Sequence, residues 1–473
     1  RLASIEPDPR EAGVVSDLVI KGGTVVTSGS MGVCDVGVDG ERIVQLGGDL
    51  RGRREVDGRG KYVFPGGVDV HVHLTLPVDP KPGDQVWCDD FHSGSHAALA
   101  GGITTIGNMT FQRQGETPRD ALQRDLASAE RDAAVDYILH PVLTDPSESS
   151  LAQIPDLASA GHTSLKIFML FEYFDKRIGE YLRALQAAGQ SGMLTMLHCE
   201  DGAIVRCVCR ELLAKGLGAI RHYPDSRPTY TESAAAERAV AFVRATGAPI
   251  YVVHLSSTAA LAACRRARAD GLPVYVETRP LYLYLTRELF EQPDGAKYVG
   301  APPLREATDV QSIWHGLHSG DIQCLCSDHA PWTLDAKLDP ALDVTTVRAG
   351  VADLETLMPM LYSEGVRRGR ISLSRFVDLT STNTAKLFGM YPQKGTIAVG
   401  SDADLVVWDP DARKTIAGAT MRSNAGYSVY DGREVVGWPA VTISRGEVVY
   451  EGGQVTARRG RGRWVKRKAT MAL

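Results

Sequence analysis

Short apolar runs recur along most of this chain, and each run contains or is followed by a polar residue. The runs are YVFPGGVDV, TSLKIFML, GMLTMLH, APIYVVH and IQCLCSD, and segments with helical spacing such as ESAAAERAVAFVRAT lie between them. Strands that alternate with helices predict repeated βα units and therefore a parallel barrel. The predicted fold class is α/β, with a (β/α)8 barrel of the TIM type over residues 65–394.

The polar residues of these runs are the candidate functional groups. His71 and His73 are two positions apart in an expected strand, so both imidazoles point to the same side of it. Two nitrogen ligands on one rigid element suit a metal ion, although ordinary structural histidines show the same H-x-H spacing. The other residues of this kind are Lys166, His198, His254 and Asp328. The carboxyl ends of barrel strands meet at one mouth, so we expect these side chains to converge there.

The order of these six residues resembles that of the cyclic-amidohydrolase branch of the amidohydrolase superfamily, the dihydropyrimidinases and hydantoinases. The resemblance extends from SDLVIKGGTVV near the start to STNTAKLFGMYPQKGTIAVGSDADLVVWDP near the end of the chain. It implies a metal-dependent enzyme that opens a C–N bond of a cyclic amide or imide, of the dihydropyrimidine or hydantoin class. In this family a hydroxide that bridges two divalent ions, zinc or manganese, is the nucleophile.

The resemblance also implies a role for each candidate ligand. His71, His73 and Asp328 would hold the more buried ion, and His198 and His254 the more exposed one. One alternative is a site with a single metal, and another is an inactive relative. The carboxylate of Asp328 would also carry the proton from the attacking water to the leaving nitrogen, as a catalytic acid and base, unless it is only a ligand.

Lys166 has a special place in this scheme. A lysine inside an apolar strand needs a partner or loses its charge. In the family that the chain resembles, the lysine at this position reacts with CO2, and the resulting carbamate bridges the two ions. A carbamate is a hard, bidentate oxygen donor, as such a bridge requires.

The positions that contact the substrate depart from the family pattern. A tyrosine that binds the oxyanion is replaced by Phe171, which cannot donate a hydrogen bond, so Tyr173 or the metals alone would take that role. A serine that binds the cyclic amide is replaced by Ala301, whose backbone still offers a donor and an acceptor. An asparagine corresponds to Ala349. The predicted pocket is therefore less polar than in the family.

Two arginines near these positions allow alternative placements. Arg279 and Arg348 either point into the pocket, where they would meet an acidic substituent of the substrate, or lie on the surface, and the surface is the simpler expectation. The segments TLPVDPKPGDQVW, residues 75–87, and FEYFDKR, residues 171–177, are the expected gate loops that control stereochemical preference.

The two ends of the chain predict a second domain. Residues 1–64 and 395–456 each contain short alternating stretches punctuated by glycines, typical of antiparallel strands. Neither end makes a good sheet alone, so together they predict a β-sandwich packed on the barrel. The basic tail, residues 457–473, is expected to be a docked arm anchored by Trp464 at an oligomer contact, and the resemblance implies a homotetramer.

Composition narrows the remaining possibilities. A net charge of −5 gives no general attraction to nucleic acid or acidic membranes, and no apolar run is long enough for a membrane helix. The basic tail alone would favour nucleic acid, but a single terminal run is usually a solvated or docked segment. Eight scattered cysteines show no zinc-finger or disulfide spacing, and we expect a cytoplasmic enzyme without nucleic-acid or membrane partners.

Other functions are also compatible with this pattern. An allantoinase-like or other cyclic imide hydrolase is the nearest alternative. A dihydroorotase is disfavoured because Leu74 and Thr75 follow the histidine pair, where those enzymes place an arginine. A non-catalytic scaffolding relative would have lost metal ligands, whereas this chain has kept all of them.

Overall fold

The computed structural model describes residues 15–74 and 86–473. Its first large element is an eight-stranded parallel sheet in which the strands follow one another in chain order. The strands are β6 (Gly67–Val72), β7 (Ile103–Phe111), β8 (Asp136–Val142), β9 (Ser164–Phe168), β10 (Leu194–His198), β11 (Ile250–Val252), β12 (Val274–Thr278) and β13 (Cys324–Leu325). Val72 pairs with His329 just beyond β13, so the sheet curves round until its two edges meet.

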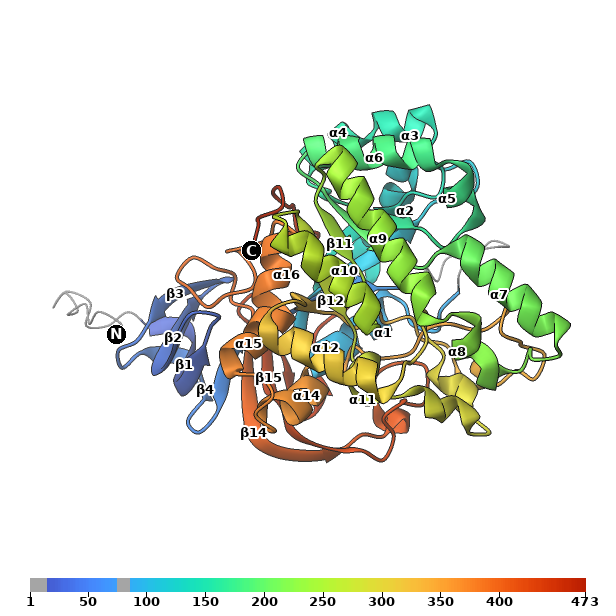
Figure 1. Cartoon of the computed structure of the whole chain (residues 1–473). Coiled ribbons are helices and arrows are strands. Elements are labelled where there is room, and N and C mark those ends of the chain that lie inside the picture. Colours follow the sequence, from blue (N-terminus) through green and yellow to red (C-terminus); the bar gives the residue numbers. More distant parts are fainter. Residues whose placement is uncertain (1–14, 75–85) are drawn as a thin grey trace.

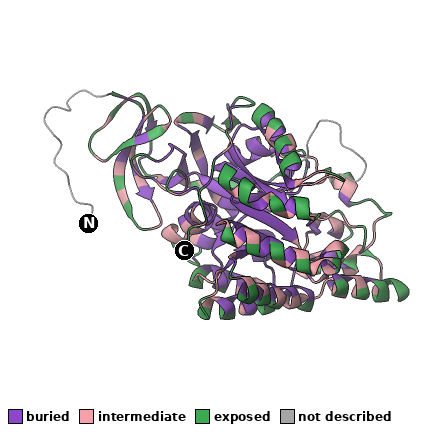
Figure 2. Cartoon of the chain, turned by 90° about the horizontal axis from the view of Figure 1, so that it is seen from above, coloured by how far each residue is buried: buried purple, intermediate pink, exposed green. Residues whose placement is uncertain are grey.

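Helices cover the outside of this barrel. The longer ones are α1 (Phe91–Ala100), α2 (Pro118–Asp132), α6 (Ile178–Gln190), α7 (Gly202–Ala214), α9 (Thr229–Thr246), α10 (Thr258–Ala269) and α12 (Ala307–Ser319). Figure 2 shows buried strands at the centre and helices whose outer faces are exposed. The helix expected from ESAAAERAVAFVRAT is α9, which ends at Gly247 with a left-handed φ of 69°.

Shorter helices complete the connections. They are α3 (Glu148–Ala152), α4 (Ile154–Ala160), α5 (Glu172–Lys176), α8 (Tyr223–Ser226), α11 (Leu281–Tyr284), α13 (Leu334–Lys337), α14 (Leu357–Leu361), α15 (Leu373–Val377) and α16 (Asn383–Leu387). One expected gate loop contains α5. The other lies mainly outside the described residues, which resume at Val86.

The second large element is a nine-stranded mixed sheet built from both ends of the chain. Its strands are β1 (Val15–Val26), β2 (Met31–Asp39), β3 (Arg42–Leu46), β4 (Arg51–Asp57), β5 (Tyr62–Pro65), β14 (Leu405–Thr415), β15 (Glu434–Ser444), β16 (Glu447–Glu451) and β17 (Gln454–Val455). β5 joins the two halves because it pairs with β1 on one side and β14 on the other. Figure 1 shows the blue and orange strands side by side. The predicted α/β barrel with a β domain from both termini is confirmed.

A buried ion cluster joins the sheet to the barrel. The Nζ atom of Lys394 lies 2.5 Å from Asp136, 2.9 Å from Asp402 and 2.6 Å from Asp404, and Lys394 is almost fully buried. Arg445 adds a contact of 3.0 Å to Asp136, the first residue of β8. Burial alone would lower the pKa of Lys394, but the three carboxylates outweigh it and raise that pKa. Lys394 is therefore the cation that all three carboxylates share, although Arg445 also pairs with Asp136 and Arg42 with Asp402.

Removal of this lysine is expected to destabilise the protein strongly. Lys394→Met would remove the cation that the three buried carboxylates share, and loss of one partner from a buried ion pair costs about 3–5 kcal/mol of unfolding free energy. Urea unfolding measures the change. The matched control is Lys176→Met, because Lys176 is exposed and its ion pair in the described part of the chain is with exposed Glu172, so it should change stability by less than about 0.5 kcal/mol. Equal, small effects of both variants would contradict a structural role for the cluster.

The basic C-terminal tail is docked on its own chain. Trp464 pairs with Tyr137 at the start of β8, and the Tyr137 N–H donates to the carbonyl of Arg463 at 2.9 Å. The guanidinium of Arg467 is buried and donates to Ser164 Oγ at 2.7 Å. The tail therefore lies against the amino-terminal ends of strands in its own barrel. A contact with another subunit stays a prediction.

No helix in the described part of the chain is both long and apolar enough to cross a membrane.

Candidate metal centre and substrate pocket

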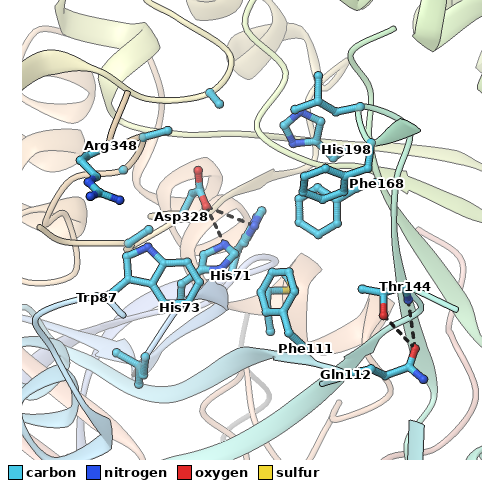
Figure 3. Close-up of a pocket in the computed structure, with 18 of the residues that line it drawn as sticks. His71, His73, Trp87, Phe111, Gln112, Thr144, Phe168, His198, Asp328 and Arg348 are labelled. Carbon is cyan, nitrogen blue, oxygen red and sulfur yellow. Dashed lines mark hydrogen bonds and ion pairs between the residues drawn. The ribbon is translucent and has the colours of Figure 1, made fainter. Parts of the chain in front are cut away.

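The six predicted ligands come together at the carboxyl ends of the barrel strands. A pocket of about 1140 Å³ opens there, and five of the six line it. They are His71 in β6, His73 just after it, His198 at the end of β10, His254 after β11 and Asp328 after β13. Lys166 in β9 is fully buried. Figure 3 shows Asp328 beside the histidine pair, with His198 and Phe168 on another side of the pocket.

The donor atoms around Asp328 are close enough to share an ion. Asp328 Oδ1 lies 3.3 Å from His71 Nε2 and 3.1 Å from His73 Nε2. Ligand atoms of His71, His254 and Asp328 all lie within 4.8 Å of one another. Neutral imidazoles and a carboxylate are the ligands that zinc and manganese take in proteins. Burial also lowers the pKa of His73 to about 4, so its ring is uncharged and free to bind a metal at neutral pH.

Buried carboxylates orient the imidazoles. Glu277 Oε1 lies 2.7 Å from His71 Nδ1 and accepts the His254 N–H at 3.0 Å. Such a contact fixes the proton on Nδ1 of His71, so that Nε2 faces the pocket as a ligand. Glu200 fixes the proton of His198 on the other ring nitrogen, Nε2, because Glu200 Oε2 lies 2.8 Å from His198 Nε2. The ring of His198 therefore has Nδ1 left for an ion.

These supporting residues were not predicted from the sequence. Glu277 lies in the apolar strand VYVET, and an acidic residue there is a usable signal, but nothing local links it to His71, 206 positions earlier. Glu200 follows His198 by two residues, and Arg227 donates to it at 2.7 Å. Asp69 accepts the N–H groups of His71 and Ser327, each at 3.0 Å, and so connects β6 to the segment after β13.

Lys166 places a buried amine over the ring of Phe168, 4.8 Å from the ring centroid. Its Nζ atom is fully enclosed and has no hydrogen bond among the described residues. Burial lowers the pKa of this amine to about 8, so a larger share is uncharged at neutral pH than for an ordinary lysine. An uncharged amine is the form that reacts with CO2. The residue therefore fits the carbamate that the resemblance implies.

The backbone at two candidate ligands is strained. His254 and Asp328 have φ values of 40° and 48°, in the left-handed region that favours glycine. Such strain costs on the order of 1–3 kcal/mol per residue and is concentrated at functional sites. It turns both side chains toward the pocket immediately after their strands end.

The simpler expectation placed Arg279 on the surface, and the structure shows that this is wrong. Arg279 is fully buried and its Nη1 donates to Asp328 Oδ2 at 2.6 Å. Burial would raise the pKa of the Asp328 carboxyl, but the Arg279 guanidinium outweighs burial and holds that pKa well below its usual range. The ion pair occupies Oδ2 and leaves Oδ1 directed at the histidine pair. Arg348, in contrast, is exposed, at a position that lines the pocket.

The positions where the family contacts its substrate all line this pocket. Phe171 is 38% exposed, and its ring packs against Phe168 and Tyr173 at centroid distances of 5.2 Å. The hydroxyl of Tyr173 is enclosed, without a hydrogen-bond partner among the described residues. Ala301 and Ala349 lie in loops that line the pocket and add no polar side chain. The wall next to Phe171 is consequently aromatic, while polar and charged side chains such as Gln112 and Arg124 line other parts of the pocket.

Comparison with known proteins agrees with this geometry. The model of the Amidohydrolase family matches residues 62–449. The D-hydantoinase of Ralstonia pickettii is 37% identical over 459 residues, which cover 96% of this chain and 99% of that protein. The structure of a D-hydantoinase from Bacillus sp. AR9 matches with a TM-score of 0.91 at 38% identity, covering 96% of this chain and 99% of that one.

A dihydropyrimidinase from Brevibacillus agri NCHU1002 matches with a TM-score of 0.90 at 36% identity, and it covers 96% of this chain and 99% of that chain. The chain therefore belongs to the amidohydrolase family, and within that family to the group of hydantoinases and dihydropyrimidinases.

Proposed function

We propose that this protein hydrolyses a C–N bond of a cyclic amide or imide, in the dihydropyrimidine or hydantoin class. The observation that carries the proposal is the convergence of four histidines, a buried lysine and an aspartate at the mouth of the barrel. Membership in the hydantoinase and dihydropyrimidinase group supports the choice of ring. A scaffolding relative has no need for a complete donor set with its orienting carboxylates.

The donor set fits two divalent ions, zinc or manganese. His71, His73 and Asp328 would hold one of them, and His198 and His254 the other. A carbamate on Lys166 would join the two. When bound, the ions would supply a bridging hydroxide as nucleophile and would polarise the ring carbonyl as Lewis acids. The uncharged ring of His73 and the buried Lys166 amine, which has no hydrogen bond among the described residues, are the observations that support this assignment.

The substrate would be oriented by backbone groups. Ala301 lines the pocket, and neither its N–H nor its carbonyl takes part in a backbone hydrogen bond in the described part of the chain. A cyclic amide presents one donor and one acceptor on adjacent ring atoms, which one residue's backbone can match. Ala301 would therefore hold the ring without a polar side chain.

Asp328 would move the proton. Its Oδ1 atom faces the same pocket as the histidine pair, and a carboxylate there can take a proton from the attacking water and deliver it to the leaving nitrogen. Because Arg279 occupies Oδ2, a role as ligand alone stays an alternative. The Asp328→Asn variant discussed below separates the two.

A substrate panel tests the proposed function. Protein loaded with zinc or manganese is assayed with dihydrouracil, hydantoins, succinimide-type imides, allantoin and dihydroorotate. We expect ring opening of hydantoins or dihydrouracil. Turnover of allantoin alone would favour the allantoinase-like alternative, and no turnover of any ring by protein with two ions bound would contradict the proposal.

The lost tyrosine gives a prediction about turnover. Phe171→Tyr is expected to raise turnover of simple hydantoins, by up to the ~10²-fold associated with one oxyanion donor, because Phe171 is partly exposed to the pocket. Steady-state kinetics measure the gain. Tyr173→Phe is the matched control, and it should change little because the Tyr173 hydroxyl is enclosed. A large loss in Tyr173→Phe would instead assign the oxyanion role to Tyr173.

A homotetramer and a cytoplasmic location stay predictions from the sequence.

A further inference from the structure

Arg348 places a positive charge at the edge of the pocket. Its guanidinium lies over the ring of Trp332, with the central carbon 5.1 Å from the ring centroid, and both residues line the pocket. Figure 3 shows Arg348 on the same side of the pocket as Trp87, across from Gln112. The charge is therefore accessible to a molecule that occupies the pocket.

Side-chain hydrogen bonds fix the backbone of the loop that carries Arg348. The buried Nζ atom of Lys337 donates to the carbonyl of Arg348 at 2.8 Å, of Gly350 at 2.9 Å and of Val299 at 2.6 Å. The indole N–H of Trp332 donates to the carbonyl of Ala349 at 2.9 Å. Because the backbone is fixed and the side chain lies on an aromatic face, Arg348 has less conformational freedom to lose on binding than an ordinary surface arginine.

The acidic groups in the pocket lining are already paired. Among the described residues these are Glu116, Asp125 and Asp328. Arg124 pairs with both Glu116 and Asp125, and Arg279 pairs with Asp328 at 2.6 Å. Arg348 has no carboxylate partner in the described part of the chain, so its charge is available to a ligand.

We propose that the pocket takes a cyclic amide whose ring substituent ends in a carboxylate, and that Arg348 binds this carboxylate. The inference rests on the proposed function, which places the ring between the metal ligands and Ala301. A guanidinium matches a carboxylate with two parallel hydrogen bonds, and a single arginine balances a single negative charge. Trp332 and Trp87 would flank the hydrocarbon part of the substituent.

Two hydantoins that differ in one group make a matched test. They are 5-(2-carboxyethyl)hydantoin and its neutral amide, 5-(2-carbamoylethyl)hydantoin, which have nearly the same shape. Affinity is measured by titration calorimetry and kcat/KM by steady-state kinetics, both on the metal-loaded full chain. We expect a preference of about tenfold for the carboxylate, reduced by added salt because Arg348 is exposed.

The variants assign the preference to Arg348. Arg348→Gln should lose the preference and bind the neutral amide within about twofold of the wild-type value, whereas Arg348→Lys should keep part of it. Arg370→Gln is the matched control, because Arg370 is also exposed and lies over a tryptophan, Trp314, but outside this pocket. It should behave as the wild type.

The outcomes separate this inference from the proposed function. Equal binding of the two hydantoins, no binding of either, or a preference that survives in Arg348→Gln would overturn the inference, even if rings are hydrolysed. A preference for the carboxylate that depends on Arg348, without hydrolysis of any ring, would support the inference and contradict the proposed function.

Discussion

Lys166→Ala is expected to reduce bound metal from two ions per chain to one or none and nearly to abolish turnover. Turnover should fall by more than the ~100-fold that loss of an outer hydrogen-bond partner of a metal ligand costs. The reason is that the group proposed to join the two ions disappears. Metal content is measured by mass spectrometry on protein dialysed against metal-free buffer, and turnover on a hydantoin.

Stability provides an internal control for this variant. Because Lys166 Nζ has no hydrogen bond among the described residues, its removal breaks none, and the alanine variant should still unfold cooperatively. Short carboxylic acids such as acetate or propionate should restore part of the metal and the activity by entering the space of the lost side chain. Full activity with two ions bound in the alanine variant would rule out the carbamate bridge.

Asp328→Asn is expected to lose far more turnover than substrate affinity. Proton transfer by a positioned side chain contributes about 10²–10⁴-fold, and asparagine keeps the shape of aspartate but cannot take the proton. The measurement is kcat and KM together with metal content. With metal retained, kcat should fall within that range while KM changes only severalfold.

A second aspartate serves as the matched control. Asp309 is buried on α12, away from the pocket, and its carboxylate accepts the N–H of Thr258 at 2.8 Å. Asp309→Asn should leave kcat unchanged because an asparagine oxygen also accepts that hydrogen bond. Near-normal turnover in Asp328→Asn with both ions bound would leave Asp328 the role of ligand only.

The barrel and the position of its chemical groups were predictable for a simple reason. Parallel strands that alternate with helices must present their carboxyl ends at one mouth, so polar residues after short apolar runs had to converge. Lys166 and His198 illustrate this. Lys166 lies in β9 and His198 in β10, these two strands pair with each other, and both side chains are buried. The pairing of β5 with β14 was also expected in outline, because neither end of the chain supplies a complete sheet.

What could not be predicted depends on contacts between distant residues. The sequence near Arg279 does not show that its guanidinium is buried against Asp328, 49 positions later. The contact between His71 and Glu277 could not be predicted for the same reason, because the two residues are 206 positions apart in the sequence. The run of basic residues in the tail likewise predicts that the tail is docked, but it does not predict on which surface. The spacing of the charges does not determine whether that surface belongs to the same chain or to another subunit. Arg467 in fact reaches Ser164 in its own barrel.

The central claim is that the six strand-end residues hold two divalent ions. It is tested most directly by a crystal structure of the zinc-loaded protein with anomalous scattering measured at the zinc edge. We predict two peaks about 3.5–4 Å apart, one against His71, His73 and Asp328 and one against His198 and His254, with density that continues beyond Lys166 Nζ as a carbamate. A single peak, peaks outside this pocket, or density that ends at Nζ would contradict the account.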